Sequence, residues 1–241
     1  MPKITLKYEF IPLQDLHSSV LPTPISDFPK SFAEPEKLDA FNKVFANFNL
    51  HGDDILNSVF DDSTEHIFDV TITTGLPSPY DAWTIANNGS PKIFFNLDEW
   101  TIDEIHSAGI RVVIHEVTHA LLHPFLKNMD ITTPIGRLNK IVIDEGIAHF
   151  IGFPGDRADL LTKWRNKWEP AEEALKQTYT QFTLKSISST QESQLLQEAD
   201  TGSFWSKYGA ISGMFRAANI YSQEGGKGLK AAIHAHQLLK K

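Results

Sequence analysis

The stretch His115-Glu116-Val117-Thr118-His119 decides how the rest of the chain is interpreted. Residues four apart lie on one face of an α-helix, so His115 and His119 can direct two imidazoles to one point. Ring nitrogens that converge in this way are ligands that a zinc ion prefers. Glu116 lies beside that point, where a carboxylate can accept a proton from water. The motif therefore predicts a zinc site built on a helix.

The residues around this motif are mostly apolar. The run 110–114 leads into it, and Ala120-Leu121-Leu122 follows it. A helix that is apolar on most of its faces is typically buried. Two imidazoles and a carboxylate in such a helix need partners, because unpaired polar groups are costly there. A bound metal ion is the natural partner, and a pair of surface histidines on an ordinary helix is the alternative.

A catalytic zinc ion needs a third protein ligand. A histidine six residues after His119, as in the metzincins, is excluded because that position is Phe125. A glutamate from a second helix is the other option. Glu145 falls in line with Leu138 and Val142 on an otherwise apolar face, so we expect its carboxylate to point inward and bind the metal. The alternative is a partly exposed helix carboxylate.

Two neighbours of Glu145 are candidates to support the site. His149 lies one helical turn further on and shares the face of Glu145. We expect it to contact a metal ligand, to replace one, or simply to pack in the core. Asp144 directly precedes Glu145 and is a further candidate to contact a ligand. The small residues Gly146 and Ala148 predict a close approach of the two helices that carry the ligands.

The limits of the motif helix are also predicted. Thr101 and Glu104 form the pattern of a capping box, which starts the helix. We expect the helix to cover residues 101–122 and to stop before Pro124. His123 is too far along the helix to meet the same ion, and we expect it to cap the helix C-terminus, where a cation is favoured.

Together, His115-Glu116-x-x-His119 and the downstream Glu145-Gly146-x-Ala148 resemble the gluzincin branch of zinc metallopeptidases. The chain is most similar to small bacterial zinc-dependent proteases with an E-G-x-A second helix. The resemblance covers residues 92–155, and Tyr208-Gly209, the counterpart of a Tyr-Gly segment in that family, extends it to residue 226. It implies a zincin-like fold, a bound zinc ion and the hydrolysis of peptide bonds. Some relatives carry an acidic residue at the position of His149.

The proposed reaction gives Glu116, Tyr208 and the strand 92–97 expected roles. Glu116 accepts a proton from the water that attacks an amide carbonyl and passes it to the leaving amine. Tyr208 is the candidate donor to the oxyanion, and the alternative is that it packs between helices. The predicted strand 92–97 is expected to be a sheet edge onto which an extended peptide adds. The Gly-x-Met-Glu-Asn segment of aminopeptidase relatives is absent, which favours an endopeptidase.

Two other classes of function stay open at this point. The first is a metal hydrolase that acts on a non-peptide amide. The second is a degenerate zincin that serves as a binding module. The presence of Glu116 argues against the second class, because a protein without catalysis has no need of this carboxylate.

Composition limits the partners. The formal net charge of −8 argues against nucleic acid, because phosphate binding needs a basic surface. Cysteine is absent, which excludes disulfides and thiol catalysis. No apolar run reaches the roughly 20 residues that span a bilayer, and the first residues lack the apolar core of a signal peptide. We therefore expect a soluble protein, cytoplasmic or secreted with its leader removed, that acts on peptides or proteins; its oligomeric state stays open.

The order of the predicted elements indicates an α+β fold, because strands precede the motif helix and helices follow it. We expect one zincin-like domain over residues 1–241, with a small mixed sheet in 1–100 and a helical part that carries the metal site in 101–241. The predicted strands are 4–13, 68–73, 82–86 and 92–97. The predicted helices are 38–48, 101–122, 138–150, 156–167, 170–182, a short one opened by Ser189 and Glu192, 206–221 and 229–239.

Overall fold

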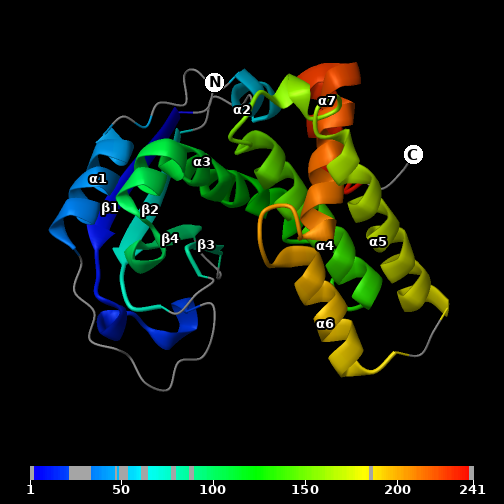
Figure 1. The fold of residues 1–241 in the computed structure, drawn as a ribbon, viewed down its shortest axis with the longest axis horizontal. Coiled ribbons are helices and arrows are strands. Elements are labelled where there is room, and N and C mark those ends of the chain that lie inside the picture. Colours follow the sequence, from blue (N-terminus) through cyan, green and yellow to red (C-terminus); the bar gives the residue numbers. More distant parts are fainter. Residues whose placement is uncertain are drawn as a thin grey trace. The chain divides into compact units, whose positions relative to one another are not determined.

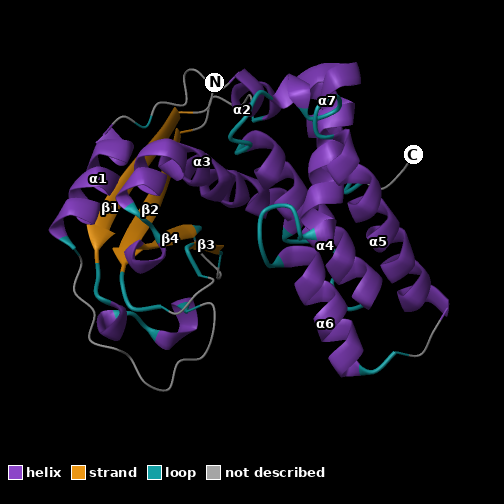
Figure 2. Cartoon of the chain, in the orientation of Figure 1, coloured by secondary structure: helices purple, strands orange, loops and turns teal. Residues whose placement is uncertain are grey.

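The computed structural model describes residues 3–21, 34–46, 48, 54–60, 65–76, 80–86, 90–184 and 187–238. These residues confirm the predicted α+β class, with four strands in the first half of the chain and helices in the rest (Figures 1 and 2). The chain divides into two compact units, residues 1–121 and 122–241, which we call the N-terminal and the C-terminal unit. The division lies later than the predicted boundary at residue 100, so most of the motif helix belongs with the sheet.

The sheet of the N-terminal unit is mixed and has the strand order β1-β2-β4-β3. Strands β1, β2 and β4 are parallel, and β3 runs antiparallel to β4. The bounds are Lys3–Phe10 for β1, Glu65–Thr73 for β2, Ala82–Ile85 for β3 and Lys92–Asn96 for β4. All four predicted strands are therefore present.

The prediction that strand 92–97 forms a sheet edge is wrong. Strand β4 pairs with β2 on one side and with β3 on the other, so both of its backbone edges are occupied. The apolar run Ile93-Phe94-Phe95 explains this position, because a strand buried on both faces belongs inside a sheet rather than at its edge. Among the described strands, β3 and β1 are the ones at the two edges.

Helices α1 (Pro35–Ala46) and α3 (Ile102–Leu126) belong to one face of this sheet. The ring centroids of Phe41 and Phe45 of α1 lie 5.5 and 5.8 Å from that of Phe95, so this face of the helix packs in the core. Gly109 of α3 lies close to Val44 of α1. A further helix, α2 (Asp54–Val59), was not predicted. The opposite face of the sheet is covered by an apolar cluster of Leu13, Leu76, Trp83 and Phe94.

The start of α3 matches its prediction. The backbone N–H of Glu104 donates to Thr101 Oγ1 at 3.2 Å, and the Glu104 carboxylate accepts from the N–H of Thr101 at 2.9 Å. The bond from the Thr101 N–H to the carboxylate, and a second from the Thr101 hydroxyl at 2.8 Å, hold the pKa of Glu104 below its usual value. The predicted end is wrong, because α3 continues to Leu126 with Pro124 inside its last turn. A proline there removes a single backbone bond, which the end of a helix tolerates.

Thr101→Ala removes the cap of α3, and we expect the free energy of unfolding to fall by about 1 kcal/mol. The measurement is urea unfolding of the full chain followed by tryptophan fluorescence. The matched control is Ser107→Ala, an exposed position in the same helix, where alanine favours the helix slightly. Equal unfolding midpoints for the two variants would contradict a capping role for Thr101.

The C-terminal unit consists mainly of four helices. They are α4 (Pro134–Ile151), α5 (Arg165–Leu184), α6 (Ser189–Asp200) and α7 (Tyr208–His234). Helix α4 begins four residues before its predicted start, because Thr133 caps it and Pro134 occupies its first position. The capping box of α6 is Ser188 with Gln191, one residue before the predicted pair.

Two further predictions in this unit differ from the structure. Residues 156–167 contain a short 3-10 turn, Arg157–Asp159, and only the beginning of α5. Pro170 lies inside α5 rather than in its first turn. The predicted helices 206–221 and 229–239 are joined in α7, and Gly225, with a φ of 67°, interrupts α7 between them. The predicted last helix ends at His234, and its last predicted residue, 239, lies outside the described residues.

Helices α4 and α7 cross at a pair of glycines. A Cβ atom added at Gly146 would lie 2.4 Å from Cα of Gly213, and one added at Gly213 would lie 2.0 Å from the carbonyl oxygen of Val142. Neither distance is compatible with a side chain. Gly146 was expected to allow close approach between the helices that carry the metal ligands, and the close approach that the structure describes is between α4 and α7.

Candidate metal site

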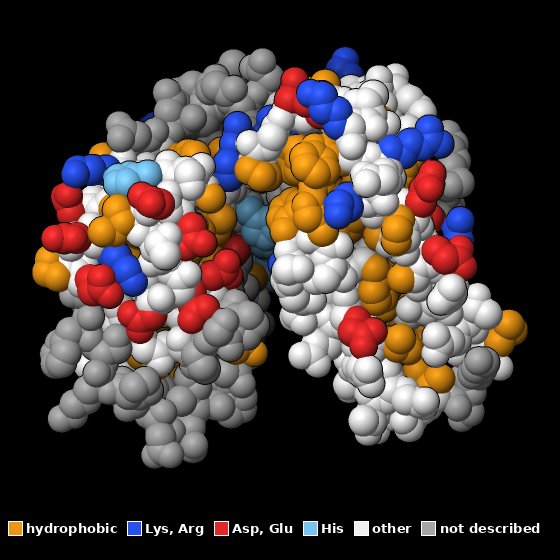
Figure 3. All heavy atoms as spheres, in the orientation of Figure 1, with side chains coloured by type: hydrophobic (Ala, Val, Ile, Leu, Met, Phe, Trp, Pro, Cys, Tyr) orange, Lys and Arg blue, Asp and Glu red, His pale blue; other side chains and the backbone are white. Residues whose placement is uncertain are grey.

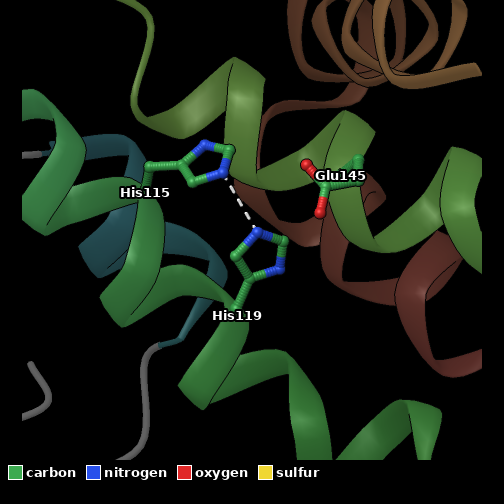
Figure 4. Close-up of side chains that lie close together, drawn as sticks. All are labelled: His115, His119 and Glu145. Atoms are coloured by element: carbon green, nitrogen blue, oxygen red, sulfur yellow. Dashed lines mark hydrogen bonds between the residues drawn. The ribbon is translucent and has the colours of Figure 1, made fainter. Parts of the chain in front are cut away.

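The two histidines of the motif point their Nε2 atoms at each other from one face of α3 (Figure 4). These atoms are 3.0 Å apart, and the ring centroids are 4.7 Å apart with an angle of 81° between the planes. Two nitrogens bound at zinc distances to one tetrahedral ion are separated by about 3.3 Å. His115 and His119 therefore have nearly the spacing that a shared zinc ion requires.

Glu145 of α4 completes a group that could hold a metal ion. One ligand atom from each of His115, His119 and Glu145 lies within 4.8 Å of the others, and all three residues are partly buried. The carboxylate of Glu145 points toward the two imidazoles (Figure 4). Two imidazole nitrogens and a carboxylate oxygen form one of the ligand sets of catalytic zinc sites.

Glu116 is buried and is held by a residue that sequence analysis missed. Its side chain is 4% exposed. The hydroxyl of Thr84, in β3, donates to Oε2 of Glu116 at 2.7 Å and lies 3.2 Å from the backbone oxygen of the same residue. The sequence alone gives no indication that Thr84 contacts Glu116, because this contact depends on which face of β3 is directed at α3.

His149 contacts Glu145 in two ways. Its Nδ1 lies 2.9 Å from the backbone oxygen of Glu145 and 3.5 Å from Oε2 of the same residue. A carbonyl oxygen only accepts, so Nδ1 carries the hydrogen. The ring is 4% exposed and packs against Phe204, with centroids 5.2 Å apart. Of the three roles left open for His149, contact with a ligand residue and packing in the core are the two that this geometry supports.

Asp144 and His123 interact with the same lysine, Lys140. Asp144 lies 4.0 Å from Lys140, one turn back on α4. Burial is the main influence on His123 and lowers its pKa; Lys140 lowers it further, whereas Asp144 acts in the opposite direction. His123 does lie in the last turn of α3, but burial favours its neutral form rather than the cation expected there. The geometry gives Asp144 a contact with a lysine, and its role beside Glu145 stays a prediction.

Tyr208, the candidate donor to an oxyanion, uses its hydroxyl for packing between helices. Its O–H donates to the backbone oxygen of Leu195 at 2.6 Å and accepts a bond from Thr178 at 3.0 Å. The side chain is buried, and this burial raises the pKa of Tyr208. A phenol has one hydrogen to donate, and here a carbonyl takes it. These contacts describe the alternative role, so we assign Tyr208 to the core.

Comparisons with known proteins add no relative. The chain matches no family model, no curated protein and no solved structure. The resemblance to gluzincins therefore rests on the motif residues themselves and on the arrangement of His115, His119 and Glu145.

The charges on the surface and the apolar character of the helices are the two observations that concern the predicted partners. Acidic and basic side chains are interspersed on the face of the molecule that Figure 3 shows. Within the described part of the chain, none of the helices combines the length and the apolar character that crossing a membrane requires.

Proposed function

We propose that this protein is a zinc-dependent hydrolase of peptide bonds. The observation that carries the proposal is the convergence of ligand atoms from His115, His119 and Glu145 within 4.8 Å. Glu116 adds the general base, because it follows His115 directly and its carboxylate is buried and held in place. A pair of surface histidines would need neither the third ligand nor a fixed carboxylate beside it.

The donor set fits zinc better than the other common cations. Calcium and magnesium prefer oxygen ligands, and two of the three atoms here are imidazole nitrogens. Three protein ligands leave the fourth position of a tetrahedral ion for water or substrate, which is the pattern of catalytic rather than structural zinc. His115, His119 and Glu145 would hold the ion.

Zinc bound by these residues would supply an activated water and polarise the carbonyl of the substrate. Glu116 accepts the proton as the water attacks, and it then donates this proton to the leaving amine. His149 orients Glu145 through the bond to its backbone oxygen and through its contact with the carboxylate.

The edge of the sheet is suited to binding an extended peptide as substrate. Strand β3 is an edge strand among the described strands, and its residue Thr84 contacts the proposed base. An extended peptide that pairs with β3 would pass beside Glu116, with main-chain hydrogen bonds providing affinity. This arrangement suits cleavage within a chain, so we propose an endopeptidase with a zincin-like fold.

The test is the metal content of purified wild type and Glu145→Ala after dialysis against zinc, measured by elemental analysis. We expect one zinc per chain in the wild type and a much weaker zinc affinity in the variant, because two histidines alone leave the ion underligated. The matched control is Glu173→Ala, since Glu173 is an exposed helix carboxylate that contacts Gln177. It should bind zinc like the wild type.

Three outcomes would change this proposal. Wild type that takes up no zinc would point to a binding module instead of an enzyme. A zinc-loaded wild type that cleaves no peptide library, but hydrolyses small amides in a chelator-sensitive manner, would move the substrate to a non-peptide amide. Full zinc affinity in Glu145→Ala would remove Glu145 from the ligand set.

A further inference from the structure

We propose that Thr84 is a positioning residue that holds the carboxylate of Glu116 for proton transfer. This inference rests on the proposed function, because it assigns Thr84 a role in the same reaction. It extends that function from the motif helix to the edge strand β3, where the sequence motif gives no indication of a functional residue.

The register of the sheet places Thr84 toward α3. Thr84 pairs with Ile93 across the antiparallel β3–β4 ladder, and directly paired residues have their side chains on the same face. Ile93 is fully buried on that face, whereas the next pair, Trp83 and Phe94, belongs to the cluster on the opposite face. A β-branched apolar residue would suit the position of Thr84 equally well for packing. Its hydroxyl is the feature that packing does not explain.

That hydroxyl has one hydrogen and two acceptors of the same residue within reach. The carboxylate oxygen Oε2 of Glu116 is at 2.7 Å, and the backbone oxygen of Glu116 is at 3.2 Å. The distance to Oε2 is the shorter of the two and lies in the usual range for a hydroxyl donor, so Oε2 takes the hydrogen. The bond joins β3 to α3 at the residue that would transfer the proton.

Fixing Oε2 has a consequence for the rest of the side chain. The outer torsion of a glutamate is broad, so a carboxylate without an anchor samples many orientations. A donor at Oε2 restricts this rotation and presents the carboxylate to the attacking water in one orientation. Misplacement of a reacting group by about 1 Å lowers rates by roughly 100-fold. Thr84 would therefore act on kcat through Glu116.

The experiment compares Thr84→Val and Thr84→Ser in the zinc-loaded full chain, with peptide cleavage and zinc content measured for each. Valine keeps the shape and removes the hydroxyl, and serine keeps the hydroxyl. We expect Thr84→Val to lose roughly 10- to 100-fold in kcat, with KM and zinc content near wild type, and Thr84→Ser to recover most of the rate. The control is Thr73→Val, a buried threonine of the same sheet whose hydroxyl has no hydrogen-bond partner among the described residues. It should cleave at the wild-type rate.

A double variant separates positioning from a merely structural role. If Thr84 acts through Glu116, Thr84→Val lowers the residual rate no further once Glu116→Gln is present. An additional loss in that background, or a full rate in Thr84→Val, would overturn the inference while leaving the hydrolase intact. A zinc-loaded wild type without chelator-sensitive cleavage would instead refute the proposed function, and with it the role of Thr84.

Discussion

Glu116→Gln should lower the rate of peptide cleavage by about 10²- to 10⁴-fold while leaving the zinc content unchanged. Glutamine has nearly the shape of glutamate and can still accept a bond from Thr84, but its amide cannot take a proton from water. General base catalysis by a positioned side chain contributes about 10²- to 10⁴-fold, so kcat should fall by that amount. The measurement combines steady-state cleavage of a fluorogenic peptide with elemental analysis of the same samples.

The control for this prediction is Asp103→Asn, which makes the same acid-to-amide change on the exposed first turn of α3. It should retain the wild-type rate and the wild-type zinc content. Substantial cleavage by Glu116→Gln would remove this residue from the reaction and leave a metal site with some other base. Loss of zinc in Glu116→Gln would show that the carboxylate supports the metal rather than the proton transfer.

The sequence predicts those parts of the site that depend on local geometry. The spacing of His115 and His119 determines that they share a helix face, and the structure brings their Nε2 atoms within 3.0 Å. The capping box at Thr101 is equally local, since its bonds join residues three apart. Glu145 was identified because a carboxylate on an apolar face needs a partner, and that requirement again comes from the periodicity of one helix.

Features that depend on contacts between segments far apart in the sequence could not be predicted from local patterns. The apolar run of β4 is compatible with an internal strand, but which strands pair with it, β2 and β3, is set by the pairing of the whole sheet and not by the strand itself. Thr84 became visible only when the register with Ile93 gave the direction of its side chain. The hydroxyl of Tyr208 is bonded to Leu195 of another helix, so its motif-based role could not be separated from packing before the helices were placed.

Two prolines show that sequence rules for the ends of helices can also fail for energetic reasons. Pro124 and Pro170 each remove one backbone hydrogen bond, and sequence rules therefore place a helix end or start beside them. Pro124 lies in the last turn of α3, and Pro170 lies one turn inside α5. In both helices the remaining bonds and the packing outweigh the loss. Local propensity is a weak preference that tertiary packing overrides.

Gly146→Ala should strongly destabilise the C-terminal unit, because an added methyl group has no room where α4 and α7 cross. The new Cβ would lie 2.4 Å from Cα and 2.5 Å from the carbonyl carbon of Gly213, both of which are backbone atoms that cannot rotate away. Helices α4 and α7 must therefore separate. Overpacking of this kind costs about 3 kcal/mol, which exceeds the roughly 1 kcal/mol that alanine gains over glycine in a helix. Thermal unfolding of the full chain should show a fall in Tm of roughly 5–10 °C.

The same variant connects stability to the site, because Gly146 directly follows Glu145. A shift of α4 would move the third ligand, so zinc affinity should fall together with Tm. Gly109→Ala is the matched control: its Cβ would meet side-chain methyl groups of Val44 and Ile105, the nearest at 3.3 Å, and no backbone atom is among these contacts. Its Tm should stay within a few degrees of wild type. A Gly146→Ala protein that melts like Gly109→Ala would mean that α4 and α7 are not held in contact. The close crossing of α4 and α7 would then not explain why a glycine follows Glu145.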